Sequence, residues 1–241
     1  RCRRFMKQCS MWENIRILLR RPDGSVSRML SGECGREIPK EYLLFGNGAS
    51  ELFLAVVHAL KPRNIVIPVP SFYGYEYVAE AAGSYIKYVY LPEETGFRPG
   101  RELLQELTAD TDMLFVANPN NPTGQLMGRE YLQELLEHCR QQGITVVVDE
   151  CFIEFCESGR EQPKFLLREI GQYENLLLAR AFTKSFAMPG VRLGYLVCSN
   201  AELREKIRRQ LPEWTCRCLP RERASPARSS QSNICKTQWN M

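Results

Sequence analysis

Between residues 41 and 209, short apolar runs alternate with segments whose apolar residues recur every three or four positions. The runs NIVIPV, DMLFVA, ITVVVD, NLLLAR and LGYLVC are largely apolar, and YIKYVYL is a further candidate strand. The segments between them include SELFLAVVHAL, YGYEYVAEAAG, RELLQELTAD, GREYLQELLEHCRQQG and NAELREKIRRQL, whose spacing is typical of helices. This alternation predicts an α/β fold of three layers, α/β/α, with a mainly parallel sheet covered on both faces.

Signals at the ends of these segments refine the prediction. Gly143 is placed to end one helix, and Asn200 is placed to cap the start of the last one. In sheets of this kind, ligands bind outside the carboxyl ends of the strands. The polar motifs of the chain follow the predicted strands, so we expect the functional site at that edge.

The two ends of the chain lack this pattern. Residues 1–38 are rich in Arg and Cys without a clear period, and residues 212–241 show no apolar periodicity. We therefore expect an atypical N-terminal segment (1–38), one large domain (39–211) and an unpatterned, disordered tail (212–241). The abrupt loss of pattern predicts a chain that is truncated or frame-shifted at both ends.

Composition limits the classes of protein that the chain can represent. It has 241 residues, 44% hydrophobic, and a net charge of +4 that is too small and scattered to favour nucleic acid. No apolar run approaches the roughly 18–20 residues that span a bilayer, so we expect a soluble, cytoplasmic protein. The sequence contains ten cysteines, which could bind zinc. The two histidines, His58 and His138, do not have the spacing that a zinc site requires. We expect reduced thiols and no metal.

One motif could bind an anion, and another could stack on a flat ring. The stretch GNGASE (46–51) directly precedes a predicted helix, whose free N–H groups form an anion seat; it is also compatible with an ordinary helix start. After the strand NIVIPV come Phe72, Tyr73, Tyr75 and Tyr77. An aromatic ring here could stack on a heterocycle or simply pack on the sheet.

Three further motifs carry polar chemistry. The loop ANPNNPTG (117–124) is stiffened by its prolines and either presents an Asn amide or tightly connects two elements. Asp149 ends a wholly apolar strand and needs a partner, because burial of a lone carboxylate is costly. Lys184 lies among apolar and hydroxyl residues, with Arg192 eight positions on. It is either a lysine at the edge of the core or an amine that does chemistry in an apolar environment.

Taken together, NPNNPTG, the DE after a strand and TKSFAMPGVRLGY resemble the class I/II aminotransferases, which are pyridoxal-phosphate enzymes of fold type I. The resemblance extends from Pro39 to Leu211. It implies the large domain of that fold, pyridoxal 5'-phosphate as cofactor and a homodimer. Family members continue into a small C-terminal domain with an arginine that binds the substrate carboxylate, and nothing after Trp214 resembles it.

The resemblance also implies a role for each matching residue. Lys184 forms a Schiff base with the cofactor and moves protons, and Asp149 pairs with the ring nitrogen. Asn121 hydrogen-bonds the ring oxygen, and Phe72 stacks on the ring. The cofactor phosphate is bound by Ala49, Ser50, Thr183 and Arg192.

The chain departs from the family pattern at three positions. Phe152 stands where many relatives have a tyrosine that hydrogen-bonds the ring oxygen. Ala181 stands where a hydroxyl residue often contributes to the phosphate site. Arg21 stands near the place of a tyrosine that reaches the partner subunit's phosphate.

Within the family, the chain is similar to the branch of histidinol-phosphate aminotransferases and L-threonine-O-3-phosphate decarboxylases, the latter acting in cobalamin biosynthesis. LLFGNGASELFLAVVHALKP, DECFIEF and FTKSFAMPGVRLGY favour the decarboxylase. The resemblance thus implies action on a phosphorylated amino acid or amine. The alternatives are a transaminase, or a catalytically incomplete remnant that at most binds the cofactor.

Overall fold

The computed structural model describes residues 23–156, 165–184 and 192–212. Its α-helices are α2 (Asp23–Cys34), α3 (Ala49–Leu60), α4 (Gly74–Ala81), α5 (Arg101–Glu106), α6 (Arg129–Gln142), α7 (Phe165–Glu169) and α8 (Ala201–Arg208). Its strands are β1 (Leu43–Gly46), β2 (Asn64–Val69), β3 (Tyr85–Tyr90), β4 (Met113–Ala117), β5 (Thr145–Asp149), β6 (Leu176–Ala181) and β7 (Gly194–Val197). Short 3-10 turns are η2 (Lys40–Tyr42), η3 (Glu93–Thr95) and η4 (Ile153–Phe155).

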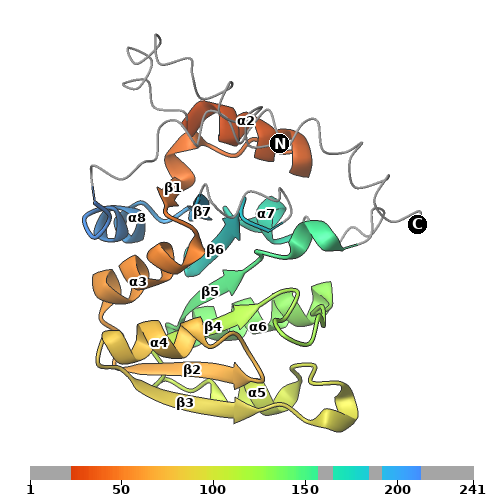
Figure 1. Ribbon diagram of the computed structural model, residues 1–241. Helices are drawn as coiled ribbons and strands as arrows, with labels where there is room; N and C mark the ends of the chain where they lie inside the picture. The colour runs from red at the N-terminus through yellow and green to blue at the C-terminus, as the bar shows by residue number, and fades with distance from the viewer. Residues whose placement is uncertain (1–22, 157–164, 185–191, 213–241) are drawn as a thin grey trace, which may run out of the picture.

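The strands form one seven-stranded sheet in the order β1-β7-β6-β5-β4-β2-β3 (Figure 1). The strands β3, β2, β4, β5 and β6 are parallel, whereas β7 is antiparallel to both β6 and β1. The predicted mainly parallel sheet is therefore confirmed. Because β7 reverses direction, its amino end lies at the same edge as the carboxyl ends of β1 and β6.

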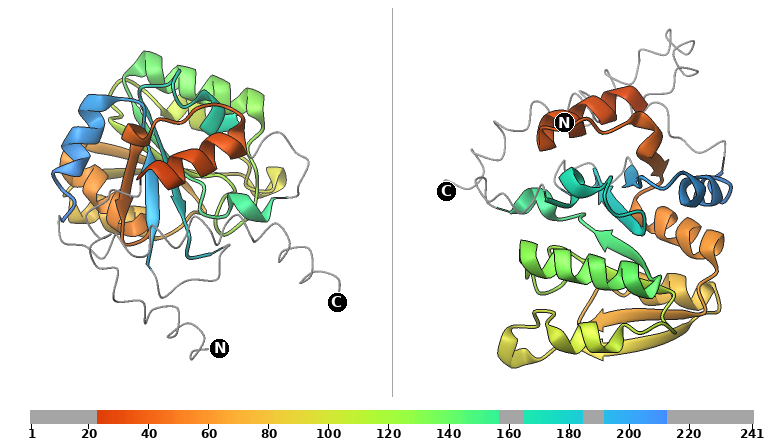
Figure 2. Two further views of the ribbon diagram at one scale, coloured as in Figure 1. Left: turned by 90° about the horizontal axis from the view of Figure 1, so that it is seen from above. Right: turned by 180° about the vertical axis from the view of Figure 1, so that it is seen from behind.

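Helices cover both faces of the sheet, which confirms the predicted three layers (Figure 2). One core cluster joins one face of the sheet to buried residues of α2, α5, α6 and α7. The other cluster joins the opposite face to α3, α4 and α8, which lie together on the left in Figure 1. Alternate residues of β5 and β6 belong to the two clusters, as the period of two in a strand requires.

Two helix ends follow the sequence signals. Gly143 ends α6 in the left-handed region at φ 77°, which glycine adopts without steric penalty. The side chain of Asn200 accepts hydrogen bonds from the backbone N–H groups of Glu202 and Leu203 at the start of α8. Both predictions are confirmed.

The helix α2 and the strand β1 were not expected from the sequence. Val26, Leu30 and Cys34 are buried along one stripe of α2, at spacings of four residues. They belong to the same core cluster as the sheet, so the core extends to the N-terminal side of Pro39. Three apolar positions among polar residues are too narrow a stripe to stand out as a period. The expected tail and Arg21 lie outside the described residues, apart from Pro212.

Candidate functional site

The N-terminus of α3 lies against the start of β7. Gly46 of β1 pairs with Gly194 of β7, and Gly194 also pairs with Ala181 of β6. A Cβ atom on Gly194 would lie 2.6 Å from the carbonyl carbon of Gly48 and 2.7 Å from the nitrogen of Ala49. Only glycine allows this approach, which places the backbone at the start of α3 beside the carboxyl end of β6.

Arg192 closes over this helix terminus. One of its terminal nitrogens lies 2.8 Å from the position that a Cβ on Gly48 would occupy. Arg192 itself has a φ of 49°, in the left-handed region that residues with side chains rarely adopt. Thr183, just beyond β6, is buried. The structure thus brings together the predicted set of Ala49, Ser50, Thr183 and Arg192 at one edge, with a guanidinium over the positive end of a twelve-residue helix.

Part of this terminus serves the helix itself. Glu51 turns back, and its carboxylate accepts hydrogen bonds from the backbone N–H of Asn47 at 2.6 Å and from the Asn47 amide at 3.2 Å. The N-cap residue Gly48 makes no side-chain cap. The helix-start interpretation is therefore supported, because Glu51 stabilises the start of α3. Anion binding by the N–H groups that follow Gly48 stays a prediction.

Asp149 ends β5 and is only 9% exposed. Its Oδ2 accepts a hydrogen bond of 2.8 Å from the Tyr75 hydroxyl, and its Oδ1 accepts one of 2.9 Å from the Cys151 backbone N–H. Burial raises the pKa of Asp149, while hydrogen bonds from Cys151 and Tyr75 and the charge of Lys184 act in the opposite direction. The partner that the sequence required is Tyr75, which the sequence had suggested only as one of four candidate stacking rings.

Aromatic rings wall the site beside Asp149. Phe72, predicted to stack on a ring, is half-buried at the end of β2 and touches Tyr75 edge-on, with centroids 5.5 Å apart. Tyr75 in turn stacks on Phe115 at 5.3 Å. Tyr73, by contrast, is 76% exposed. Phe72 precedes α4 and meets the buried Tyr75 of its first turn, whereas Tyr73 lies largely in solvent.

The Asn-Pro loop is held by its own amides. The Oδ1 of Asn118 accepts from the Met127 backbone N–H at 2.9 Å, and Nδ2 of Asn120 donates to the Pro70 carbonyl at 3.0 Å. Asn121 is left to line an open cavity of about 430 Å³ together with Phe152 and Phe155. Asn118 and Asn120 thus stiffen the loop, while Asn120 and Asn121 both line the cavity.

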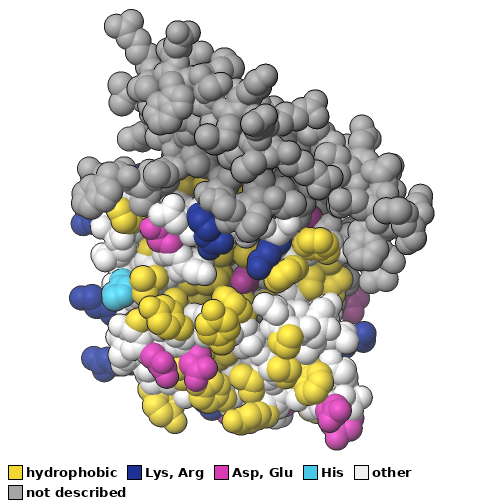
Figure 3. Space-filling view, in the orientation of Figure 1, with side chains coloured by type: hydrophobic (Ala, Val, Ile, Leu, Met, Phe, Trp, Pro, Cys, Tyr) yellow, Lys and Arg dark blue, Asp and Glu magenta, His cyan; other side chains and the backbone are white. Residues whose placement is uncertain are grey.

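Lys184 lies in the turn after β6 and is exposed. Its Nζ is 5.5 Å from the centroid of the Phe152 ring, which places the amine near the same cavity. Within the described residues, one aromatic ring borders this amine. Residues 185–191, which follow Lys184, lie outside the described residues, so the expected apolar environment stays a prediction. In the orientation of Figure 1, Lys and Arg side chains stand beside apolar surface on this face (Figure 3).

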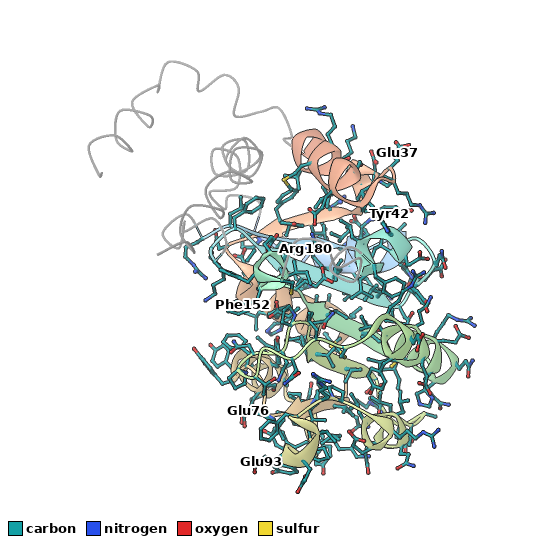
Figure 4. All side chains as sticks on the ribbon, turned by 90° about the vertical axis from the view of Figure 1, so that its right-hand side faces the viewer. Glu37, Tyr42, Glu76, Glu93, Phe152 and Arg180 are labelled. Atoms are coloured by element: carbon teal, nitrogen blue, oxygen red, sulfur yellow. The ribbon has the colours of Figure 1, made fainter. Side chains whose placement is uncertain are left out.

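A buried ion-pair group on the other side of β5 and β6 was missed from the sequence. Arg180 is fully buried and contacts Glu150 and Glu33 at 2.8 and 2.7 Å. Figure 4 shows Arg180 inside the molecule and Phe152 at its edge. Glu33 belongs to α2, so this group links that helix to β6 and to the residue that follows β5. An arginine within an otherwise apolar strand, NLLLAR, was the available signal.

Within 23–156, 165–184 and 192–212, no three His, Cys, Asp or Glu side chains gather in a way that could bind a metal ion. In that same part of the chain, no helix combines the length and apolar character needed to cross a membrane.

The family model for aminotransferase class I and II matches residues 28–230. The chain belongs to this family. Among its curated relatives, a threonine-phosphate decarboxylase from Salmonella typhimurium is 35% identical over 185 residues, 76% of this chain and 49% of that protein. A histidinol-phosphate aminotransferase from Pyrococcus furiosus is 32% identical over 182 residues, 76% of this chain and 50% of that protein. The chain spans about half the length of the curated relatives it matches.

Solved structures agree with this assignment. The histidinol-phosphate aminotransferase from Clostridium acetobutylicum superposes with a TM-score of 0.76 at 30% identity, over 92% of this chain and 62% of that one. Cystalysin from Treponema denticola, whose crystal structure contains pyridoxal 5'-phosphate, has a TM-score of 0.79 at 16% identity, over 89% and 57%; that likeness shows the fold alone. Membership of the aminotransferase family indicates pyridoxal 5'-phosphate as the cofactor.

Proposed function

We propose that this chain is the cofactor-binding part of an enzyme that acts on a phosphorylated amino acid or amine, with Lys184 as the residue that bonds to pyridoxal phosphate. One observation supports this most. The α3 terminus, Arg192, the buried Asp149 and the Lys184 amine arise from four separate segments of sequence and meet at one edge of the sheet. A structural role would not require them to converge.

The residues present fit the cofactor at both of its ends. N–H groups at a helix start and a guanidinium are the donors that bind a phosphate, and Ala49, Ser50, Thr183 and Arg192 supply them. At the other end, the buried carboxylate of Asp149 suits a protonated ring nitrogen, because a cation there would offset the desolvation of the acid. Phe72 follows β2 and Asn121 follows β4, and we propose that they contact the ring between these two ends.

The chemistry of the step divides between cofactor and chain. Pyridoxal phosphate, when bound, supplies a ring that withdraws electrons from the α-carbon of the substrate. Asp149 keeps the ring nitrogen protonated. Asn121 orients the ring oxygen, and Lys184 carries the proton to or from the substrate carbon, since its amine has no competing ion pair among the described contacts.

The activity that we propose is decarboxylation of threonine phosphate. The 35% identity to the Salmonella typhimurium enzyme supports it, as does Phe152, which leaves the ring oxygen with Asn121 as its side-chain donor. Transamination of histidinol phosphate is the second candidate, supported by the 32% identity to the Pyrococcus furiosus protein. We also propose that the active enzyme is a homodimer, on the basis of the family resemblance.

Product analysis separates these activities. The chain is incubated with pyridoxal phosphate and L-threonine phosphate, and release of carbon dioxide and 1-amino-2-propanol phosphate is measured. A parallel reaction with histidinol phosphate and 2-oxoglutarate is assayed for glutamate. We expect decarboxylation without glutamate. Glutamate formation would favour the transaminase, and a chain that binds the cofactor but forms neither product would be an incomplete remnant.

A further inference from the structure

The carboxylate of Asp149 accepts hydrogen bonds from two donors of different origin. The Cys151 N–H donates to Oδ1 at 2.9 Å, in the local turn that an aspartate commonly makes with the residue two positions on. The Tyr75 hydroxyl donates to Oδ2 at 2.8 Å from α4, 74 positions away in the sequence. The first bond comes with the local backbone, whereas the second requires a particular side chain in a particular place.

Tyr75 is itself fixed by aromatic packing. It is fully buried, and its ring stacks on Phe115 with an interplanar angle of 16°. The rings of Phe53 and Phe72 meet it edge-on, each with a centroid distance of 5.5 Å. A ring held on three sides cannot turn its hydroxyl elsewhere. The hydroxyl also stays protonated and able to donate, because burial and the nearby Asp149 raise the pKa of Tyr75.

We propose that Tyr75 is a positioning residue, which orients the Asp149 carboxylate and keeps it ionised for the ring nitrogen of the cofactor. The inference rests on the proposed function. Tyr75 acts through Asp149 and through the edge of Phe72, and so links the carboxylate at one end of the ring to the aromatic residue proposed to stack on its face. None of the sequence motifs assigns it this role.

The direction of the effect follows from the groups around Asp149. Burial disfavours its charged form, and the donors from Cys151, the Tyr75 hydroxyl and the charge of Lys184 favour it. Removing the Tyr75 hydroxyl leaves Cys151 and Lys184 in place and takes away one stabilising donor. The pKa of Asp149 in the Tyr75→Phe variant therefore rises, by about one unit for the loss of one hydrogen bond to a charged group.

The first test measures the pKa of Asp149 directly, in the absence of cofactor. The sequence holds only four aspartates, Asp23, Asp110, Asp112 and Asp149, so carboxyl carbon-13 labelling of aspartate yields four NMR signals that can be titrated. The control is Tyr88→Phe, which removes another tyrosine–carboxylate hydrogen bond, to Glu76, at the exposed end of α4. We expect the Asp149 midpoint to rise by about one unit in Tyr75→Phe only. Equal midpoints in both variants and the wild type would overturn the proposal.

The second test measures cofactor affinity from the visible absorbance of bound pyridoxal phosphate. We expect Tyr75→Phe to weaken binding about tenfold and Tyr88→Phe to leave it unchanged. In an Asp149→Asn background, Tyr75→Phe should add nothing further, because its effect passes through the carboxylate. An undiminished tenfold loss in that background would show a packing role and contradict the inference. A wild-type chain that binds no cofactor would refute the proposed function, while the aspartate titration would still decide whether Tyr75 controls Asp149.

Discussion

Asp149 and Glu150 are consecutive carboxylates, both buried at the end of β5, and their surroundings are opposite. Asp149 faces α3 and α4 and is held by neutral donors, the Tyr75 hydroxyl and a backbone N–H. Glu150 faces α2, and its Oε2 lies 2.8 Å from both Nε and a terminal nitrogen of Arg180. The one-residue offset sends the two side chains to opposite faces of the sheet.

This difference separates a carboxylate with a structural role, Glu150, from one that could bind a ligand, Asp149. Glu150 has a buried guanidinium as its partner, so its charge is already matched. Among the described residues, Asp149 accepts hydrogen bonds from a neutral hydroxyl and a backbone N–H, and the charge of Lys184 acts at longer range. A cationic ligand could therefore still balance the charge of Asp149. Burial alone therefore does not identify a functional carboxylate; the charge state of its fixed partners does.

The largest expected effect lies on the structural side. Arg180→Met removes the buried cation beside Glu150 and breaks the link to Glu33 on α2. We expect the free energy of unfolding in urea to fall by about 3–5 kcal/mol, because a buried charge is left without its partner. Arg140→Met, which breaks an exposed pair with Glu137, is the matched control and should cause no measurable loss. Equal losses of stability in the two variants would show that the buried ion pair contributes no more than the exposed one.

The next effect is the dependence of stability on pH. Burial raises the pKa of Glu150 to about 7, with Glu33 and Glu154 acting in the same direction against Arg180. A carboxyl group whose pKa is higher in the folded state favours folding below its ordinary pKa, and that contribution is lost as pH rises toward 7. Because of Glu150, we expect the free energy of unfolding to fall by about 1–3 kcal/mol as pH rises from 4.5 to 7.

Glu150→Gln checks this expectation, since it keeps the shape but does not titrate. Urea unfolding of the wild type and variant is measured across the same pH range. The difference between the two curves should change with pH in the stated direction. A constant difference would mean that Glu150 stays ionised throughout.

The smallest effect on stability, paired with a clear effect on binding, is expected at Asp149. Asp149→Asn removes a charge that burial disfavours, and the Tyr75 hydroxyl can accept from the new amide. Stability at pH 7 should therefore stay within about 1 kcal/mol of wild type or rise. Affinity for pyridoxal phosphate should fall about 10- to 100-fold. Calorimetric titration with the cofactor measures this, and an unchanged affinity would place the ring nitrogen elsewhere.

The sequence predicted the sheet and its helices well, because apolar runs and glycine or asparagine signals act locally. It also indicated Asp149, Lys184 and Arg192, which are charged residues among apolar and hydroxyl neighbours in the sequence. It could not predict that Tyr75 rather than its neighbours meets Asp149, since that choice depends on how α4 packs against Phe115 and Phe53. The role of α2 was missed for the same reason: its link to β6 through Arg180 joins residues 147 positions apart.

The proposed function requires Lys184 to bond to the cofactor at this edge of the sheet. The most direct measurement is borohydride reduction of the chain with pyridoxal phosphate, followed by peptide mapping by mass spectrometry, with Lys184→Ala as control. We expect one pyridoxyl label, on Lys184, that is absent from the variant and reduced at limiting cofactor by Arg192→Ala. A label spread over surface lysines, or one retained in Lys184→Ala at equal yield, would contradict the proposed role of Lys184.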